Sequence, residues 1–598
     1  MQKLPLRPLR LVTYSTQQLD NSQIEEHNDH VERKTTTRRG IASAPLLEKI
    51  QQIQPGSSDE AIPEAESEAR QLLKRTPGSY LLNQAYGLWI FGSLFLLTII
   101  ITRKLSVAEY GVYAVAMAAF NTIAYIVALG LEDASTTYIP RIFAEYGKVA
   151  AAVLIRRLLF LRCAILAVSV GIMLFAMPLL AALIAIIPLS GAAGVAAGFR
   201  DPMLLSHIAP IAIYVLGNGV SSLITAVCAS LMRMRFVFVV GSLTQLLLLV
   251  LSFPVLQMGW GTNGILWLFA IGSLLNALAF LFWASPLLFL RKEHDTYIQP
   301  LKPVVRLGLS AWLTNLVTGA LLKQVSIILL GYFAISIIQI GYFNLSFQLA
   351  HAASMLLVSG FGGVGGSALA AAFVGHNYDR LARSWQVLIK IETLLAAPVL
   401  MFCLFNAQNI AHALYGASYD PVGPLLAIFL FFNVIVRVLG TSTHQYALYV
   451  MGRPRLVVLS QWLGLITVIL FGILFIPHWG PAGALVADGL AQVVIGGLLL
   501  AFLWHALPRK YPLNFTLRFL LGLLIAALPG IIWHPDSRLL LGVSGTIFLI
   551  LCIGLMLAIK PLHSEDLEMI RGLNGSKRVM PVLKWFARGE KSWIRQKC

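Results

Sequence analysis

The segment Arg233-Met234-Arg235 is followed by an apolar run and then by Trp260-Gly261-Thr262-Asn263-Gly264. The same order returns later in the chain as Arg453-Pro454-Arg455, an apolar run of nearly equal length, and Trp479-Gly480-Pro481-Ala482-Gly483. Two copies of one pattern inside long hydrophobic stretches predict a duplicated helical bundle, and many membrane transporters are built in this way. The repeat therefore suggests a function before any single residue does.

The composition predicts that the chain is a membrane protein. Its 598 residues are 58% hydrophobic and only 12% charged, and the mean hydropathy is +0.77. A soluble protein of this length needs more polar surface. From about residue 80 to 560, apolar runs of about twenty residues alternate with short polar breaks, and each run can cross a roughly 30 Å hydrocarbon core as a helix. Alternation typical of membrane strands is absent, so we expect an all-α polytopic fold.

We predict about fourteen spans, at roughly 80–101, 108–131, 163–187, 205–230, 237–257, 263–289, 307–331, 337–362, 388–409, 423–448, 456–476, 482–505, 516–533 and 539–559. They divide the chain into a six-helix N-terminal lobe (80–291), a six-helix C-terminal lobe (306–505) and two further helices (515–559). Residues 1–79 form a largely disordered tail, with one short helix expected around 64–74. In the basic tail 560–598, an amphipathic helix is expected to lie on the membrane surface.

The positive charges predict the orientation. Nearly all of the 45 Lys and Arg residues fall in the two tails and the even-numbered connections. The positive-inside rule then places both termini in the cytoplasm of a cell-membrane protein. The opposite side holds only Arg103, Lys104, Arg200 and Arg538, and Lys323 and Arg437 fall within spans. The net charge of +18 thus reflects topology and anionic lipid, so we expect no nucleic-acid partner.

The sequence gives no sign of an enzyme or of a metal centre. A polar N-terminal stretch stands where a cleavable signal peptide would be hydrophobic, and the five cysteines show neither pairing nor zinc-site spacing. The outer loops are short, the longest being roughly 188–204, so a membrane-embedded polymerase or glycosyltransferase would lack its catalytic loop. The glycine-rich stretch 360–366 ends a span, and we interpret it as a flexible or closely packed helix rather than a phosphate-binding loop.

Several motifs resemble one transporter family. They are Thr102–Ala114, with the sequence TRKLSVAEYGVYA, then Leu129-Gly130-Leu131, Leu414-Tyr415-Gly416 and the two Trp-Gly-x-x-Gly turns. Over about residues 80–560 the chain resembles the O-antigen and exopolysaccharide flippases of the multidrug/oligosaccharidyl-lipid/polysaccharide (MOP) flippase superfamily. This resemblance implies alternating-access transport of a polyprenyl-pyrophosphate-linked oligosaccharide from the cytoplasmic to the outer leaflet. It also suggests polysaccharide polymerases or assembly proteins as partners. The long N-terminal tail departs from the pattern.

The repeat relates positions in the two lobes. Gly111 and Gly130 have the same spacing as Gly341 and Gly360, an offset of 230 residues. The same offset carries Asn121 to His351, and an offset of 219 carries Asn218 to Arg437. Six spans separate the copies, so the two lobes are parallel repeats. One face is polar in both lobes, and only its second copy is ionisable.

Polar side chains inside spans predict a substrate cavity. Asn344, Gln348 and His351 share one helix face, and Arg437 and His444 share another. Amides and hydroxyls in membranes often serve only helix packing, whereas a cation in lipid is costly and usually functional. We hypothesise that Lys323 and Arg437 attract the lipid pyrophosphate in a net cationic cavity, because guanidinium groups bind phosphate with two donors. Arg141 would act at entry, and Arg103 and Lys104 at release. A salt bridge from Lys323 or Arg437 to Asp488 is the structural alternative.

We expect no organic cofactor, but transport could be coupled to H⁺ or Na⁺. Asp488, Asp133 and Glu132, with His351, are the candidate coupling residues, although a buried carboxylate can equally be a neutral hydrogen-bonding group or an ion-pair partner. The nearest rival function is a drug or cation antiporter of the same superfamily, which would need an acidic cavity. A polymerase or glycosyltransferase and a scaffold without transport are the more distant alternatives.

Overall fold

The computed structural model describes residues 64–176, 206–231, 233–288, 290, 297–315, 321–333, 335–355, 361–373, 377–532 and 537–560. These residues form helices, with no strand in the described ranges. The predicted amphipathic C-terminal helix, the loop 188–204 and Gly360 lie outside them. The all-α membrane fold is confirmed, because eleven described helices are long and apolar enough to cross a membrane. The seventh, eighth and thirteenth predicted spans have no counterpart among these eleven helices.

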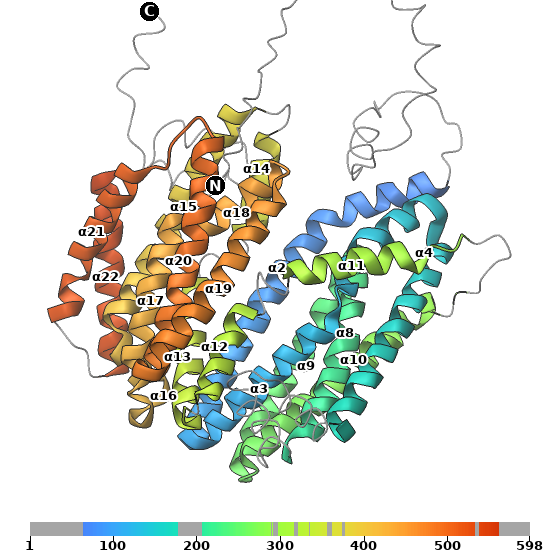
Figure 1. Cartoon of the computed structure of the whole chain (residues 1–598), viewed down its shortest axis with the longest axis horizontal. Coiled ribbons are helices and arrows are strands. Elements are labelled where there is room, and N and C mark those ends of the chain that lie inside the picture. Colours follow the sequence, from blue (N-terminus) through green and yellow to red (C-terminus); the bar gives the residue numbers. More distant parts are fainter. Residues whose placement is uncertain are drawn as a thin grey trace, which may run out of the picture. The chain divides into compact units, whose positions relative to one another are not determined.

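The N-terminal lobe contains α2 (Glu64–Lys104), α3 (Val107–Ala128), α4 (Leu131–Gly171) with the short π-helix η2 (Ile172–Ala176), α8 (Ile208–Ser230), α9 (Met234–Gln257) and α10 (Gly261–Leu288). Helix α8 packs on α4 and α10, and α2 packs on α9. These helices stand together in Figure 1. Helix α2 begins at Glu64, so the expected short helix near 64–74 exists but continues into the first span.

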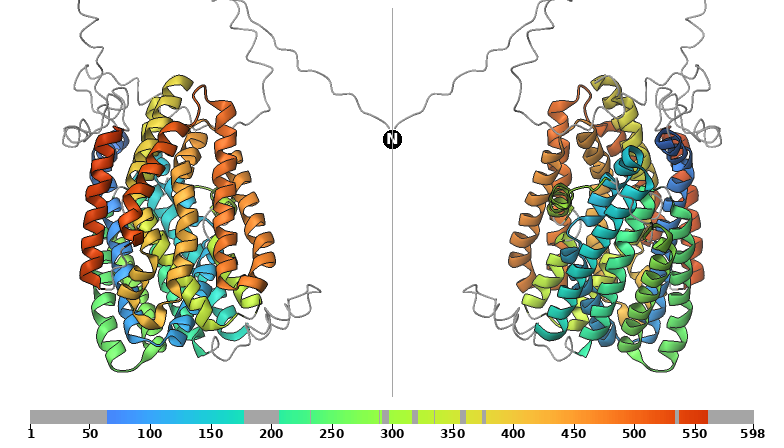
Figure 2. Two further views of the ribbon diagram at one scale, coloured as in Figure 1. Left: turned by 90° about the vertical axis from the view of Figure 1, so that its left-hand side faces the viewer. Right: turned by 90° about the vertical axis from the view of Figure 1, so that its right-hand side faces the viewer.

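The C-terminal lobe contains α12 (Leu321–Tyr332), α13 (Ile337–Met355), α14 (Phe361–Ala372), α15 (Tyr378–Phe405), α16 (Ala407–Tyr415), the 3₁₀ turn η5 (Ala417–Tyr419), α17 (Val422–Leu439), α18 (Thr441–Val450), α19 (Pro454–Trp479) and α20 (Pro481–Ala506). Helix α11 (Leu301–Asn315), which precedes them in the chain, packs on α4 of the N-terminal lobe. Helix α20 packs on α19 and α17. Helices α21 (Leu513–Ile532) and α22 (Arg538–Ile559) pair with each other and contact α15, outside the repeat (Figures 1 and 2).

Three predicted spans differ from the helices that the structure describes. The seventh overlaps α11 and α12 and the eighth overlaps α13 and α14, with residues 316–320 and 356–360 outside the described ranges. The third was placed at 163–187, but the membrane-spanning part of this region covers Glu145–Phe175. The prediction was wrong here because Arg156, Arg157 and Arg162 resemble a loop, whereas Arg162 lies within the helix and is satisfied by neighbouring helices. Helix α4 also contains a non-helical residue, Gly147.

The two copies of the repeat fold alike. Arg233 precedes α9 and Arg453 precedes α19, and their backbone N–H groups donate to Cys228 and Leu448 at 2.8 and 2.9 Å. After each apolar helix, the Trp-Gly turn begins α10 or α20. A Cβ on the first glycine of that turn, Gly261, would lie 2.9 Å from Glu109 Oε1. On Gly480 it would lie 3.8 Å from Oε1 of Gln339, the residue that the offset of 230 pairs with Glu109.

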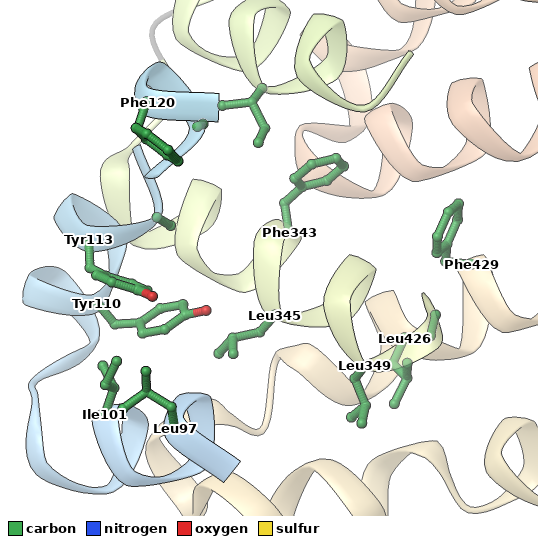
Figure 3. Packing of buried hydrophobic residues seen from close by; sticks show 14 of the residues in the cluster. Leu97, Ile101, Tyr110, Tyr113, Phe120, Phe343, Leu345, Leu349, Leu426 and Phe429 are labelled. Atoms are coloured by element: carbon green, nitrogen blue, oxygen red, sulfur yellow. The ribbon is translucent and has the colours of Figure 1, made fainter. Parts of the chain in front are cut away.

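The two lobes meet where α3 and α13 pack together. Gly111 and Gly341, which the repeat makes equivalent, lie against each other, and a Cβ on Gly341 would be 3.1 Å from Gly111 Cα. Next to them, Tyr110 and Tyr113 project from α3 toward the part of α13 that carries Phe343 and Leu345 (Figure 3). The buried Asn344 donates to the Tyr110 hydroxyl at 3.2 Å. Small residues thus let the helices of the two lobes approach closely.

Candidate functional site

A cavity of about 650 Å³ lies between helices of the two lobes. Its N-terminal wall is largely aromatic and aliphatic, and includes Phe91, Tyr113 and Phe269, with Asn121 and Thr98 as polar groups. Its C-terminal wall is more polar. That wall contains Gln324, Asn344, Gln348, His351, Asn433, Arg437, Ser442, Gln461, Asp488 and Gln492. The cavity therefore has one apolar and one polar side, which suits an amphipathic ligand.

Two helices place the polar wall. On α13, Gln348 donates to Asn344 Oδ1 at 3.4 Å and accepts from Thr98 of α2 at the same distance. His351 lies one turn further along α13, is exposed and lines the cavity. On α17, Asn433 and Arg437 line the cavity from successive turns. The predicted stripe on α13 is therefore a real feature of the cavity wall.

Arg437 is held by a network of buried groups. Its Nε donates to Ser354 at 2.8 Å, and its Nη1 donates to Glu392 Oε1 and to Ser442, both at 3.1 Å. Nη2 has a weaker acceptor, the sulfur of Met355 at 3.5 Å. Arg437 is 9% exposed and Glu392 is fully buried. Arg437 thus forms an ion pair with Glu392. The alternative pair between Lys323 and Asp488 stays a prediction, since the side chain of Lys323 lies outside the described residues.

The prediction of a net cationic cavity rests on Lys323 and Arg437, and the structure describes the side chain of Arg437. The charge of Arg437 is balanced by Glu392, and Asp488 adds a carboxylate to the cavity wall from α20. Asp488 is 3% exposed. Lys323 lies on α12, and its side chain is outside the described set. Arg437 lines the cavity, and the place of the Lys323 side chain stays a prediction.

A second cavity, of about 310 Å³, lies between helices of the N-terminal lobe and α11. It is lined by Asn121, Asn218, Ser222, Glu132, Asp133, Arg162 and Trp312, among others. Asn218, Glu132 and Asp133 therefore face this space rather than the larger cavity. Their candidate roles in substrate binding and ion coupling are separated from the polar wall formed by α13 and α17.

Arg162 joins three parts of the N-terminal lobe. It is 2% exposed and donates to the backbone oxygens of Val127 and Gly219 at 2.8 and 3.0 Å. It also donates to Glu132 at 2.9 Å and to Ser222 at 3.3 Å. Burial of this guanidinium is tolerable because acceptors on α3, α4 and α8 surround it. Arg162 therefore has a packing role that hydropathy alone could not reveal.

Arg103 links the two lobes. It ends α2, and its Nε and Nη2 donate to the carbonyls of Leu414 and Ala413 at 2.7 and 2.5 Å. These carbonyls belong to the last turn of α16, the negative end of the helix dipole. Lys104 lies over the ring of Phe253, with its Nζ 5.6 Å from the ring centroid. Neither residue is among those lining the larger cavity.

Two further candidates also lie away from the larger cavity. Arg141 is on the surface of α4 and pairs with Glu145 at 2.9 Å, and this carboxylate raises the pKa of Arg141. His444 is fully buried, and its Nδ1 accepts from Trp385 Nε1 at 3.0 Å. Neither residue is among those that line the cavity, so the predicted polar stripe on α17 and α18 ends before His444.

Sequence reasoning missed one member of each buried ion pair. Arg162, which pairs with Glu132, and Glu392, which pairs with Arg437, both lie near predicted span boundaries. The repeat could have found the second from the first, since adding 230 to Arg162 gives Glu392. The same offset carries the buried Leu158 to the buried Leu388. Equivalent positions thus carry opposite charges, and each is paired within its own lobe. In the described residues, no group of three or more His, Cys, Asp and Glu side chains is arranged to bind a metal.

Comparisons with known proteins agree with the fold. The model of a family described as polysaccharide biosynthesis proteins matches residues 143–424. The structure is similar to that of the lipid II flippase MurJ in an inward closed conformation, with a TM-score of 0.63 and 13% identity, covering 79% of this chain and 98% of MurJ. It is also similar to an inward-facing multidrug resistance transporter of the MATE family, with a TM-score of 0.54 and 17% identity, covering 69% and 93%.

A search of curated proteins by sequence gives no significant match. The structural similarities, at these identities, concern the fold, and the family model covers a little under half of the chain. The resemblance inferred from the sequence is confirmed at this level: the chain is a multi-pass membrane protein that matches a polysaccharide biosynthesis family over residues 143–424, and its fold is similar to those of MurJ and of a MATE-family transporter of the MOP superfamily.

Proposed function

We propose that the protein moves a polyprenyl-pyrophosphate-linked oligosaccharide from the cytoplasmic to the outer leaflet of the cell membrane. The observation that supports this most strongly is the cavity between the lobes, which has an aromatic wall on one side and a polar wall with Arg437 on the other. Such a lipid carries an apolar chain, an anionic pyrophosphate and a hydroxyl-rich glycan. The amides of Asn344, Gln348 and Asn433 can donate to and accept from sugar hydroxyls.

Alternating access would use the contact between the lobes. At the end where α3 and α13 begin, Gly111 meets Gly341 and Arg103 caps α16 across the lobes. With both termini in the cytoplasm, this closed end faces outward. In this proposal Arg103 closes the outer end rather than binding substrate there. The contact must open for release, and the lipid bilayer supplies the environment for the polyprenyl chain.

The test is deletion of the gene followed by analysis of lipid-linked glycans. We expect a polyprenyl-pyrophosphate-linked oligosaccharide to accumulate on the cytoplasmic side and its polymer to be lost from the surface. Re-expression of the protein should reverse both effects. An unchanged pool of every lipid-linked glycan would contradict the proposal. Cross-linking in the same cells would reveal any polysaccharide polymerase that binds the long N-terminal tail.

A drug or cation antiporter is the second candidate, and one observation favours it. Asp488 places a carboxylate in the cavity wall, and an acidic group in the cavity is what an antiporter of cations would need. Extrusion of a cationic dye by cells that express the protein would support this alternative. No extrusion, together with accumulation of a lipid-linked glycan in the deletion strain, would favour the flippase.

A further inference from the structure

The Arg437–Glu392 pair lies within membrane-spanning helices α17 and α15, and its atoms Nη1 and Oε1 are 3.1 Å apart. Glu392 is fully buried and is not among the residues lining the cavity, whereas Arg437 is. A buried ion pair often contributes little to stability, since removing both charges from water costs about as much as their attraction returns. Its position suggests another role.

The hydrogen bonds of this pair connect the two sides of the break between α17 and α18. Gly440 has a left-handed backbone, with φ of 76°, where α17 ends and α18 begins. Glu392 Oε1 accepts from Arg437 before the break, and Oε2 accepts from Thr443 after it, at 2.8 Å. Arg437 also donates to Ser442 across the break and to Ser354 near the end of α13. A change in the charge of Glu392 would therefore alter contacts made by three other helices, α13, α17 and α18.

The same pair controls the charge available to a ligand. An ionised Glu392 neutralises Arg437 at close range, so a phosphate in the cavity gains little from this cation. The Nη2 group, whose partner is the weak acceptor sulfur of Met355, is the donor most readily transferred to a phosphate oxygen. Protonation of Glu392 removes its negative charge and leaves Arg437 as an uncompensated cation at the cavity wall.

We propose that Glu392 is a proton-binding site that switches Arg437 between an internal ion pair and the anionic group of the transported lipid. This inference rests on the proposed function. One proton adds to the Glu392 carboxylate, the neutral acid still accepts a hydrogen bond from Thr443, and Arg437 turns its donors to the pyrophosphate. When the lipid leaves, Glu392 gives up the proton and recovers its pair with Arg437. Each transport cycle thus takes up and releases one proton.

Other ionisable groups near the pair do not replace Glu392 in this role. From α18, His444 accepts from Trp385 and lies away from the cavity. From the segment before α21, Tyr511 bonds the Val438 carbonyl, and burial together with the charge of Glu392 raises the pKa of Tyr511. From α20, Asp488 faces the cavity directly, and Lys390 precedes Glu392 on α15. Of these, Asp488 is the rival that the experiment must separate.

The experiment measures binding of farnesyl pyrophosphate to the full-length protein in lipid nanodiscs by calorimetry. Repeating it in buffers of different ionisation enthalpy gives the number of protons taken up. We expect wild type to take up about one more proton than Glu392→Gln, and the shared probe cancels protonation of the phosphate itself. In the pH range where Glu392 is mostly ionised, the affinity of wild type relative to Glu392→Gln should weaken about tenfold for each unit that the pH rises, because the fraction of protein with protonated Glu392 falls tenfold.

Glu132→Gln is the matched control, because Glu132 forms the corresponding arginine pair in the other lobe. Glu132→Gln should still take up the additional proton when farnesyl pyrophosphate binds, and so should Asp488→Asn. Equal proton uptake by wild type and Glu392→Gln would overturn the switch, as would loss of the proton in Asp488→Asn alone. If Glu392→Gln fails to fold, wild type still decides at a pH where farnesyl pyrophosphate is fully ionised both free and bound, since binding there without proton uptake overturns the switch.

The two proposals fail in different ways. Suppose wild type binds farnesyl pyrophosphate, Arg437→Ala does not, and proton uptake is the same with and without Glu392. This result overturns the switch and leaves the proposed flippase function standing. No binding of farnesyl pyrophosphate by wild type at any pH overturns the switch and also removes the pyrophosphate from the proposed function.

Discussion

Replacing Gly111 by alanine should open the contact between the lobes. A Cβ at this position would overlap the carbonyl and side chain of Ile337, which belong to the backbone and first turn of α13. Gly341 is already packed against Gly111, so α3 can move away only by separating from α13. Overpacking of a close contact typically costs about 1–3 kcal/mol. This strain acts only on the closed arrangement, so the open population should rise about 5- to 150-fold.

The assay is labelling of one cysteine in a background without the five native cysteines. Ala118→Cys on α3 lines the cavity, and a membrane-impermeant thiol reagent can be applied from either side in turn. We expect Gly111→Ala to increase labelling from the side of the α3–α13 contact. Gly92→Ala on α2 is the control, because a Cβ there meets no atom within 4 Å. Unchanged or slower labelling in a folded Gly111→Ala protein would refute the close contact as a gate.

Three further predictions test other parts of the structure. Arg162→Ala should lower stability by about 1–3 kcal/mol, measured by thermal unfolding in detergent, because the half-buried Glu132 and the carbonyls of Val127 and Gly219 lose their donor. A smaller loss would contradict the central role of Arg162 in the N-terminal lobe. Arg103→Ala removes two hydrogen bonds between the lobes, so it should also raise labelling at residue 118, by less than Gly111→Ala does. Unchanged or slower labelling would contradict this. Gly440→Ala should lower thermal stability by about 1 kcal/mol or more, because its φ is positive and a Cβ would meet Ile389; equal stability would show that the break tolerates a side chain.

Much of the fold was predictable because membrane insertion makes hydropathy a strong constraint. The Trp-Gly turns identified two equivalent lobes, and Arg233 and Arg453 do precede equivalent helices. Their spacing could not show that Gly111 and Gly341 touch each other, since such contacts depend on how two distant helices pack.

The candidate site was predicted in part for similar reasons. Helical spacing correctly grouped Asn344, Gln348 and His351, since that pattern is local. The partner of Arg437 was missed because Glu392 is on another helix, 45 residues away, beside a cluster of charges that resembled a loop. Likewise, Asn218 and Arg437 occupy positions that the offset pairs, yet they face different cavities.

The central claim is tested most directly in proteoliposomes that contain the purified protein and a fluorescent polyprenyl-pyrophosphate-linked oligosaccharide. A membrane-impermeant quencher reports the fraction of lipid in each leaflet over time. We predict that wild type moves this lipid at least tenfold faster than protein-free vesicles, and that Arg437→Ala loses most of the gain, because a bidentate phosphate contact is worth more than about 1.4 kcal/mol. Transfer by wild type no faster than in empty vesicles would contradict the account.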